Sequence, residues 1–235
     1  SSTVDIDIDG ESVWIAERCG GNVNACVNSP DTNLVMLFDK DGTMVRSFGA
    51  GYITWPHGIH VDHDGNVWIA DGRDNQGGDN PPTEAYGHQI HKFSPTGIHL
   101  MALGQKAGGR NEEYFFTPSD MHVAPNGDIF VAEGHSNTAG TTARVLKFNA
   151  DGEFLMSFGE MGSDDGQFMQ PHALAMDSKG RLFIGDRSNN RVQIFDQEGK
   201  HLDTWYQFGR PSGIYIDKHD VLYSADSESG SINPD

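Results

Sequence analysis

The sequence has little positive charge, no long apolar run and none of the common nucleotide-binding or serine-hydrolase motifs. Only 16 of its 235 residues are Lys or Arg, against 34 Asp or Glu, which gives a formal charge of −18. Nucleic acid and anionic membrane surfaces repel such a polyanion. No apolar run approaches the ~18 residues of a membrane span. We therefore expect no nucleic-acid partner and no membrane insertion, but a small-molecule or peptide substrate, and we leave the oligomeric state open.

Cysteine is also scarce: the chain has Cys19 and Cys26, seven residues apart in RCGGNVNAC. Two thiols without a second pair are too few for a zinc site built from cysteines. The spacing predicts a disulfide, which favours a periplasmic or secreted protein because disulfides persist in oxidising compartments. The alternative is two free loop thiols in a cytosolic protein. The first residues, SSTVDIDIDG, have no signal-peptide pattern, so an exported chain would already have lost its signal.

Glycine, by contrast, is abundant at 29 residues, and many of the glycines lie in the turns of an internal repeat. Four segments share an apolar alternation, a polar turn, a second apolar run and, at the end, an acidic residue. They are PHGIHVDHDGNVWIAD at 56–71, PSDMHVAPNGDIFVAE at 118–133, PHALAMDSKGRLFIGD at 171–186 and PSGIYIDKHDVLYSAD at 211–226. Alternating runs joined by short glycine turns predict hairpins, and no helical pattern competes with them.

A period of roughly 40 to 60 residues with four strands per unit is typical of β-propeller blades. We predict an all-β fold in which residues 1–235 form a single propeller domain. The predicted blades are approximately 1–52, 53–114, 115–168 and 169–209, followed by a partial blade at 210–235. Four and a half blades would leave sheet faces and edges unpaired, so we expect a longer six-bladed chain whose remainder is cleaved, missing or supplied by another polypeptide.

The residue after the proline that opens each blade alternates between histidine and serine. His57 and His172 occupy this position two blades apart, with Ser119 and Ser212 in the blades between and after them. Equivalent residues of successive blades surround the central channel, so alternate blades would direct imidazoles towards the axis. Three such histidines with an open fourth position are the arrangement of a catalytic zinc site. We predict that His57 and His172 bind a metal, with the third ligand outside residues 1–235.

His60 and His122 share another repeat position, but strand alternation gives them the opposite parity to His57. We interpret them as packing or surface residues. If the ring closed within these residues, they would be the nearest candidates to complete the metal site.

Residues 185–195, GDRSNNRVQIF, resemble an NHL repeat. The strings WPHGIHVDHDGNVWIAD and QPHALAMDSKG further resemble the lyase domain of peptidylglycine α-amidating enzymes, over nearly the whole chain. This resemblance implies zinc ligation by His57 and His172, and a third ligand in the sixth blade. It also implies active-site roles for Arg18 and Arg187, for which the alternatives are a surface ion pair and a structural arginine between blades.

One departure from the lyases concerns their essential tyrosine, because the string AEGHSN has His135 at that place. A histidine near neutral pH is suited to proton transfer, so we predict a catalytic role for His135 and a substrate that differs from the family's; an uncharged loop histidine is the alternative. The resemblance also suggests calcium bound by backbone oxygens near Val4 and Ile59.

The leading hypothesis is a zinc-dependent lyase of the amidating type that acts on an α-hydroxyglycine-like or related small hydroxylated substrate. Two alternatives stay open. The chain can be a non-catalytic NHL propeller that binds a peptide, glycan or protein, or a metal-dependent lactonase-like hydrolase.

Overall fold

A computed structural model describes residues 2–9, 12–19, 26–27, 29–75, 84–111, 113–135 and 142–227. The described residues are organised in β-strands, with one short 3₁₀ turn at Arg187–Asn189 (η1) and no α-helix among them. The chain divides into two compact units, residues 1–121 and 122–235, and the boundary falls within one strand. The predicted all-β class is confirmed.

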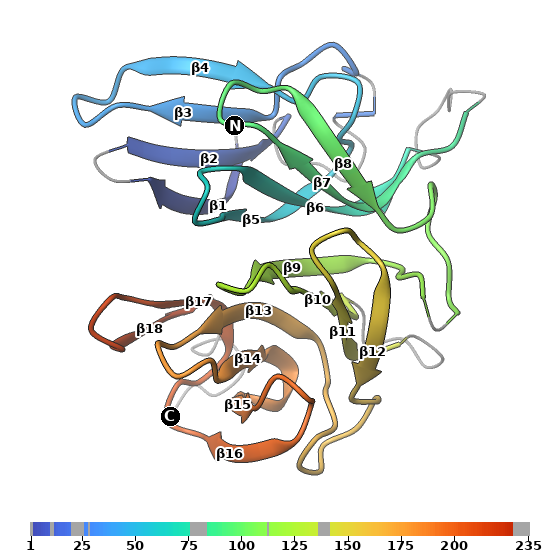
Figure 1. Ribbon diagram of the computed structural model, residues 1–235, viewed down its shortest axis with the longest axis vertical. Helices are drawn as coiled ribbons and strands as arrows, with labels where there is room; N and C mark the ends of the chain where they lie inside the picture. The colour runs from blue at the N-terminus through green and yellow to red at the C-terminus, as the bar shows by residue number, and fades with distance from the viewer. Residues whose placement is uncertain are drawn as a thin grey trace. The chain divides into compact units, whose positions relative to one another are not determined.

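The strands of the described residues form four four-stranded sheets and one two-stranded sheet; Figure 1 labels them in chain order. In each sheet, strands that follow one another in the sequence are neighbours, which is the arrangement of a propeller blade. The first two sheets are β1 (Ser2–Asp9), β2 (Ser12–Arg18), β3 (Val35–Phe38) and β4 (Met44–Phe48), then β5 (Pro56–Val61), β6 (Val67–Asp74), β7 (Gly87–Phe93) and β8 (His99–Leu103).

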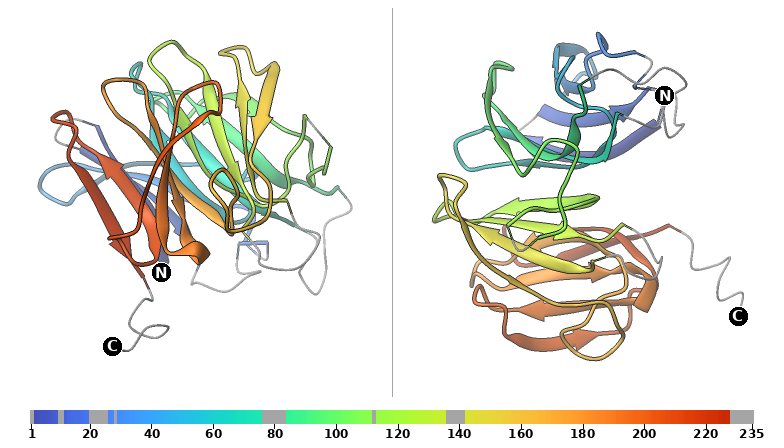
Figure 2. Two further views of the ribbon diagram at one scale, coloured as in Figure 1. Left: turned by 90° about the horizontal axis from the view of Figure 1, so that it is seen from below. Right: turned by 90° about the vertical axis from the view of Figure 1, so that its right-hand side faces the viewer.

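The third and fourth sheets, and the fifth with two strands, follow the same order. They comprise β9 (Pro118–Val123), β10 (Ile129–Glu133), β11 (Arg144–Phe148) and β12 (Phe154–Phe158), then β13 (Pro171–Met176), β14 (Leu182–Asp186), β15 (Arg191–Phe195) and β16 (His201–Trp205), and finally β17 (Pro211–Ile216) and β18 (Leu222–Asp226). Figure 2 shows the strands of a sheet running antiparallel beside one another.

Several hairpin turns form because an aspartate side chain binds the backbone that follows it. In the turn between β5 and β6, Asp62 Oδ1 accepts the backbone N–H groups of Asp64 and Asn66 at 3.0 and 2.8 Å. Gly65 closes the turn with a φ of +78°, a left-handed conformation that glycine adopts without steric cost. The acidic turns are therefore local hairpin structure.

Alternation along the strands buries one large aromatic cluster in each unit. In residues 1–121, Trp14, Phe48 and Phe93 are 1%, 7% and 1% exposed. In residues 122–235 the corresponding cluster includes Phe168 and Phe195, which are 0% and 1% exposed. Burial of such side chains, at ~1.5–3 kcal/mol each, is the main favourable contribution to the stability of both units.

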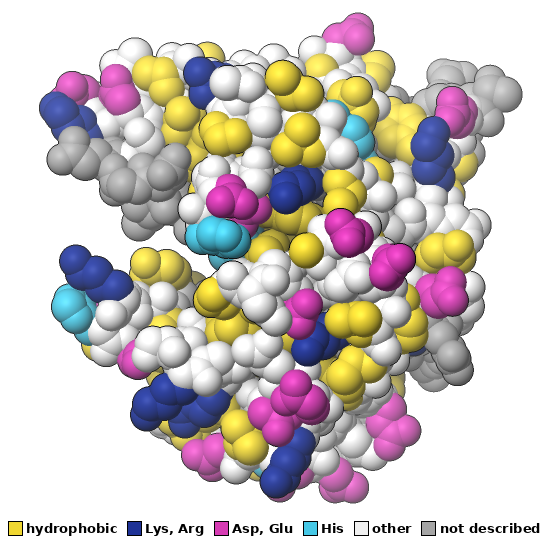
Figure 3. Space-filling model, viewed as in Figure 1, with side chains coloured by type: hydrophobic (Ala, Val, Ile, Leu, Met, Phe, Trp, Pro, Cys, Tyr) yellow, Lys and Arg dark blue, Asp and Glu magenta, His cyan; other side chains and the backbone are white. Residues whose placement is uncertain are grey.

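Cys19 and Cys26 form the predicted disulfide, with 5.1 Å between their Cα atoms. The bridge begins directly after β2, which ends at Arg18. No helix in the described part of the chain is long and apolar enough to cross a membrane. Acidic and basic side chains are interspersed over the face shown in Figure 3, so the acidic excess is carried at least there as a mixed, solvated surface.

Candidate metal and substrate site

The strand that opens a blade pairs irregularly with the second strand at its first residues. This irregular pairing sets the direction of the side chain that follows the proline. The pairing of β5 with β6 shifts register between Pro56 and Ile59, and that of β13 with β14 between Pro171 and Ala173. His57 and His172 lie within these bulges. β-Bulges re-aim a side chain relative to the strand, and they recur beside active sites.

His57, in unit 1, is 8% exposed and its ring is fixed by a backbone contact. Its Nδ1 lies 2.6 Å from the carbonyl oxygen of Ser119, which is fully buried. A carbonyl oxygen only accepts hydrogen bonds, so the hydrogen is on Nδ1 and the lone pair of the neutral ring is on Nε2. This is the contact that orients metal-binding histidines in proteins.

His172, in unit 2, repeats this arrangement. It is 9% exposed, and its Nδ1 lies 2.7 Å from the carbonyl oxygen of Ser212. Its Nε2 accepts a hydrogen bond from Nη1 of Arg187 at 3.1 Å, so the lone pair is again on Nε2. In both cases the residue that follows the opening proline of the next blade supplies the backbone carbonyl that holds the ring.

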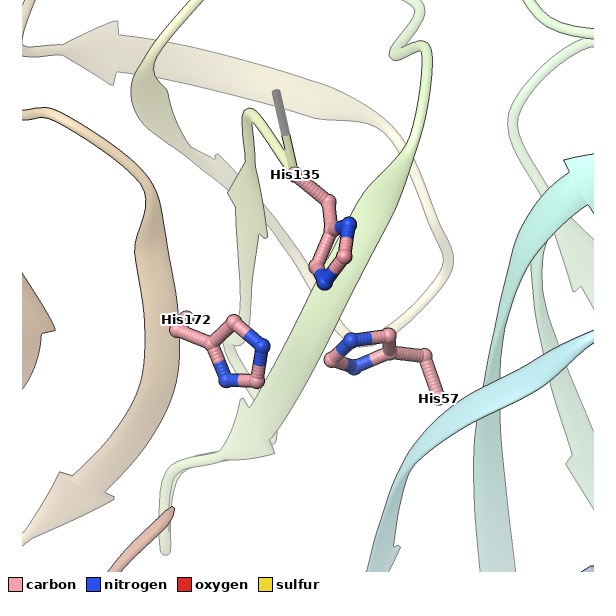
Figure 4. Close-up of side chains that lie close together, drawn as sticks. All are labelled: His57, His135 and His172. Carbon is pink, nitrogen blue, oxygen red and sulfur yellow. The ribbon is translucent and has the colours of Figure 1, made fainter. Parts of the chain in front are cut away.

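His135 lies beside His172 in the same unit. It follows β10 after Gly134, whose φ of +132° turns the chain at the end of that strand. The two ring centroids are 5.1 Å apart, and a ligand nitrogen of one lies within 4.8 Å of a ligand nitrogen of the other. Figure 4 shows these two side chains and that of His57. Unit 2 therefore presents two neighbouring imidazole donors.

Arg187 connects His172 to a polar network in unit 2. Its Nη2 and Nε donate to Oε1 of Gln170 at 2.8 and 3.1 Å. Burial, and then the nearby Arg210, lower the pKa of Arg187 to about 10, so the guanidinium is charged at neutral pH. Arg187 donates to a neutral amide and an imidazole, which leaves its charge available to an anion.

The structural arginine of this blade is a different residue. Arg191 is 2% exposed, and its Nε donates to Oδ2 of Asp186 at 2.8 Å. Its Nη2 donates to the carbonyl oxygens of Asp164 and Gln167, both at 2.9 Å. The blade-bridging alternative considered for Arg187 thus describes Arg191.

Arg18 lies at a comparable place in unit 1, above an indole ring. Its Cζ is 3.4 Å from the centroid of Trp55, and its Nε donates to the carbonyl oxygen of Pro56 at 2.9 Å. Burial, and then the charge of Arg73, lower the pKa of Arg18 to about 10. Trp55 is also 5.3 Å from the ring of His57, centroid to centroid. Arg18 and His57 are therefore neighbours of one aromatic residue.

Several contributors to the site have no signal in the sequence. The Ser119 and Ser212 carbonyls belong to the backbone, and Gln170 and Trp55 are ordinary residues in the string before a proline. Only the repeat position of Arg73, aligned with that of Arg18, could have drawn attention to it. His60 and His122, in β5 and β9, are not among the described residues grouped by metal-ligand spacing.

Comparison with known proteins agrees with this architecture. The NHL repeat model matches residues 168–195, which cover β13 to β15. A probable peptidyl-α-hydroxyglycine α-amidating lyase of Caenorhabditis elegans is 31% identical over 166 residues, 68% of this chain and 42% of that protein. NHL repeat-containing protein 3 of Mus musculus is 31% identical over 200 residues, 82% of this chain and 51% of that protein. The chain spans about half the length of these relatives.

Solved structures share the fold at lower identity. Virginiamycin B lyase from Staphylococcus aureus has a TM-score of 0.56 at 17% identity, covering 95% of this chain and 62% of that one. A gluconolactonase from Xanthomonas campestris has a TM-score of 0.63 at 16% identity, covering 94% and 68%. The fold defines a protein of β-propeller blades. The fourth blade matches an NHL repeat, and amidating lyases are among the proteins to which the chain is similar.

Proposed function

We propose that this chain is a metal-dependent carbon–nitrogen lyase of the amidating type, in which His57 and His172 are zinc ligands and His135, beside His172, is a further candidate ligand. The observation that carries the proposal is the repeated contact of a histidine Nδ1 with the serine carbonyl of the following blade, at 2.6 Å for His57 and 2.7 Å for His172. Two rings at the same repeat position are thereby fixed in the tautomer whose lone pair is on Nε2, and a metal bound to His172 would replace the hydrogen bond that this nitrogen accepts from Arg187.

The chemistry of the donor set fits zinc. Neutral imidazoles are preferred zinc ligands, and three of them leave the fourth position for substrate or water. When bound there, zinc supplies Lewis acidity towards a hydroxyl or carbonyl oxygen.

His135 has two possible roles, metal ligand and proton carrier. A ring nitrogen that binds the metal cannot also transfer a proton, so the two roles are alternatives. The sequence alone favoured proton transfer. Its place beside His172, with nitrogens within 4.8 Å, supports the ligand role as well, whereas the notion of a third histidine from outside residues 1–235 stays a prediction. Zinc content separates the two, because loss of a ligand lowers metal affinity and loss of a proton carrier lowers only turnover.

The proposed reaction cleaves the N–C bond of an α-hydroxyglycine. The hydroxyl group loses its proton and becomes the aldehyde oxygen of glyoxylate, while the nitrogen keeps the electron pair of the broken bond, gains a proton and leaves as an amide. Arg18 holds the carboxylate through charge-assisted hydrogen bonds, and Arg187 is a second active-site arginine near the substrate. These roles are supported by their guanidinium groups, which donate to neutral acceptors in the protein.

Zinc titration of the metal-stripped protein tests the proposal. We expect one zinc per chain by elemental analysis after dialysis, and at least about tenfold weaker binding in His57→Ala, His135→Ala and His172→Ala. His219→Ala, at an exposed turn, is the matched control and should bind like the wild type. Zinc below about 0.2 per chain, or unchanged affinity in His57→Ala, would overturn the metal site.

A substrate screen tests the reaction separately. The reconstituted protein should release glyoxylate from an α-hydroxyglycine peptide and should not open lactones, whereas the His57→Ala protein should do neither. Zinc binding without turnover of any substrate would favour the non-catalytic alternative, and the similarity to NHL repeat-containing protein 3 is a reason to test that alternative.

Calcium near Val4 and Ile59 stays a prediction. The disulfide supports export to the periplasm or the extracellular space.

A further inference from the structure

One repeat position carries three of the chain's few basic residues. This position comes after the acidic residue near the end of the second strand of a blade, either directly or with one glycine between them. The four strings are WIAER, WIADGR, FVAEGH and FIGDR. The residues there are Arg18, Arg73, His135 and Arg187. Three of the four already belong to the candidate site described above. Arg73 is the member with no role in the proposed reaction.

Arg73 and Arg18 converge on the same indole in unit 1. The Cζ of Arg73 lies 4.4 Å from the centroid of Trp55, and that of Arg18 lies 3.4 Å from it. Gly72 makes this approach possible, because a Cβ at that residue would come within 2.8 Å of the Trp55 ring. The arrangement therefore depends on Trp55 and on the adjacent pair Gly72 and Arg73.

The two guanidinium groups have no carboxylate partner within ion-pair distance in the described part of the chain. Asp74 adjoins Arg73 and raises the pKa of Arg73, but burial has the larger effect and lowers it. Other arginines do pair with acids: Arg144 contacts Glu133 at 2.7 Å, for example. In a chain with 34 acids and 16 Lys or Arg, two adjacent half-buried arginines with no carboxylate at ion-pair distance among the described residues form a site suited to an external anion.

We infer that Arg73 is a substrate-binding residue that acts with Arg18 to hold a dicarboxylate group. One guanidinium group can bind both oxygens of a single carboxylate. A second guanidinium group beside the same Trp55 ring therefore favours a second carboxylate close to the first. The preferred substrate is then a hydroxylated compound with two neighbouring carboxylates, one of them on the reacting carbon. This inference rests on the proposed function for the identity of the reacting group, but the anion site itself can be tested without metal.

Malonate and acetate are the probes, titrated calorimetrically into the metal-stripped protein at low ionic strength. The wild type should bind malonate at least about tenfold more tightly than acetate. Arg73→Gln should lose about tenfold in malonate affinity and keep acetate affinity within about twofold, because one charge-assisted contact is removed. Arg73→Lys keeps the charge without the fork and should retain part of the preference. Arg46→Gln, at an arginine that also donates to a backbone carbonyl, is the control and should bind like the wild type.

Unchanged malonate affinity in Arg73→Gln, with the same thermal midpoint as the wild type, would overturn the inference. Equal affinity of the wild type for malonate and acetate would overturn it as well. The result is independent of the metal site: if zinc fails to bind but malonate selects Arg73, the proposed function fails and the dicarboxylate site stands. If zinc binds and glyoxylate is released while Arg73→Gln behaves like the wild type, only this inference fails.

Discussion

The carboxyl group of Asp71 is fully buried in β6 without the arginine that its counterparts have. In the third sheet Glu133 pairs across the strands with Arg144, and in the fourth Asp186 pairs with Arg191. The residue opposite Asp71 is Gln89, whose Nε2 donates instead to the carbonyl oxygen of Gly104. Asp71 therefore has no neighbouring cation to stabilise its charged form.

Burial, and not hydrogen bonding, favours the neutral form of Asp71. It raises the pKa of Asp71 to about 7, against the opposing effect of the backbone N–H groups of Trp55 and Thr54 and of the Thr54 hydroxyl. That hydroxyl is 3.0 Å from Asp71 Oδ1 and 2.6 Å from the carbonyl oxygen of Arg73, so its single hydrogen is shared between two acceptors.

This raised pKa makes stability depend on pH with a defined sign. Between the unfolded pKa of 3.8 and the folded pKa of about 7, the folded chain keeps a proton that the unfolded chain has lost. The free energy of unfolding therefore falls as pH rises through this window, by about 4 kcal/mol in all at 1.36 kcal/mol per unit. The stabilising contribution of the protonated form is complete below pH 3.8 and lost above about 7.

Replacing Asp71 by asparagine removes the titration while keeping the size of the side chain. We expect the stability of Asp71→Asn relative to the wild type to increase by about 3 kcal/mol between pH 5 and pH 8. Urea unfolding followed by circular dichroism at unit intervals of pH measures it. Asp217→Asn is the control: the Val221 N–H, then that of His219, lower the pKa of Asp217, so its titration lies below this window and its difference from the wild type should stay constant from pH 5 to 8. A difference between Asp71→Asn and wild type that stays constant from pH 5 to 8 would refute the reasoning.

Three further changes test the packing around the site. Arg191→Ala leaves a buried carboxylate unpaired and should lower the free energy of unfolding by about 3–5 kcal/mol, measured in urea; a loss below 1 kcal/mol would contradict the structural role. Replacing Cys19 and Cys26 by serine should cost roughly 2–3 kcal/mol, and reductant should then no longer shift the thermal midpoint as it does in the wild type. Gly72→Ala should displace Trp55 and weaken malonate binding about as much as Arg73→Gln does, whereas unchanged binding would show that the indole does not position the two arginines.

The repeat in the sequence determined the blades of this protein. Four copies of an alternating run, a glycine turn and a second run already specify hairpins, because strand period and turn chemistry are local properties. The cysteine spacing likewise determined the disulfide, since only six residues separate the two thiols. His57 and His172 could be selected as metal ligands for the same reason, as members of one repeat position.

What the sequence could not decide is which groups surround those histidines. The carbonyls of Ser119 and Ser212 bind the Nδ1 atoms through the backbone, which carries no side-chain signature. His135 is far from His172 along the chain, and only the packing of β10 against β13 of the next blade brings their rings to 5.1 Å. The sequence left Arg187 with two roles, and tertiary contacts assign the structural one to Arg191, because an ion pair forms only where register places the acid opposite the base.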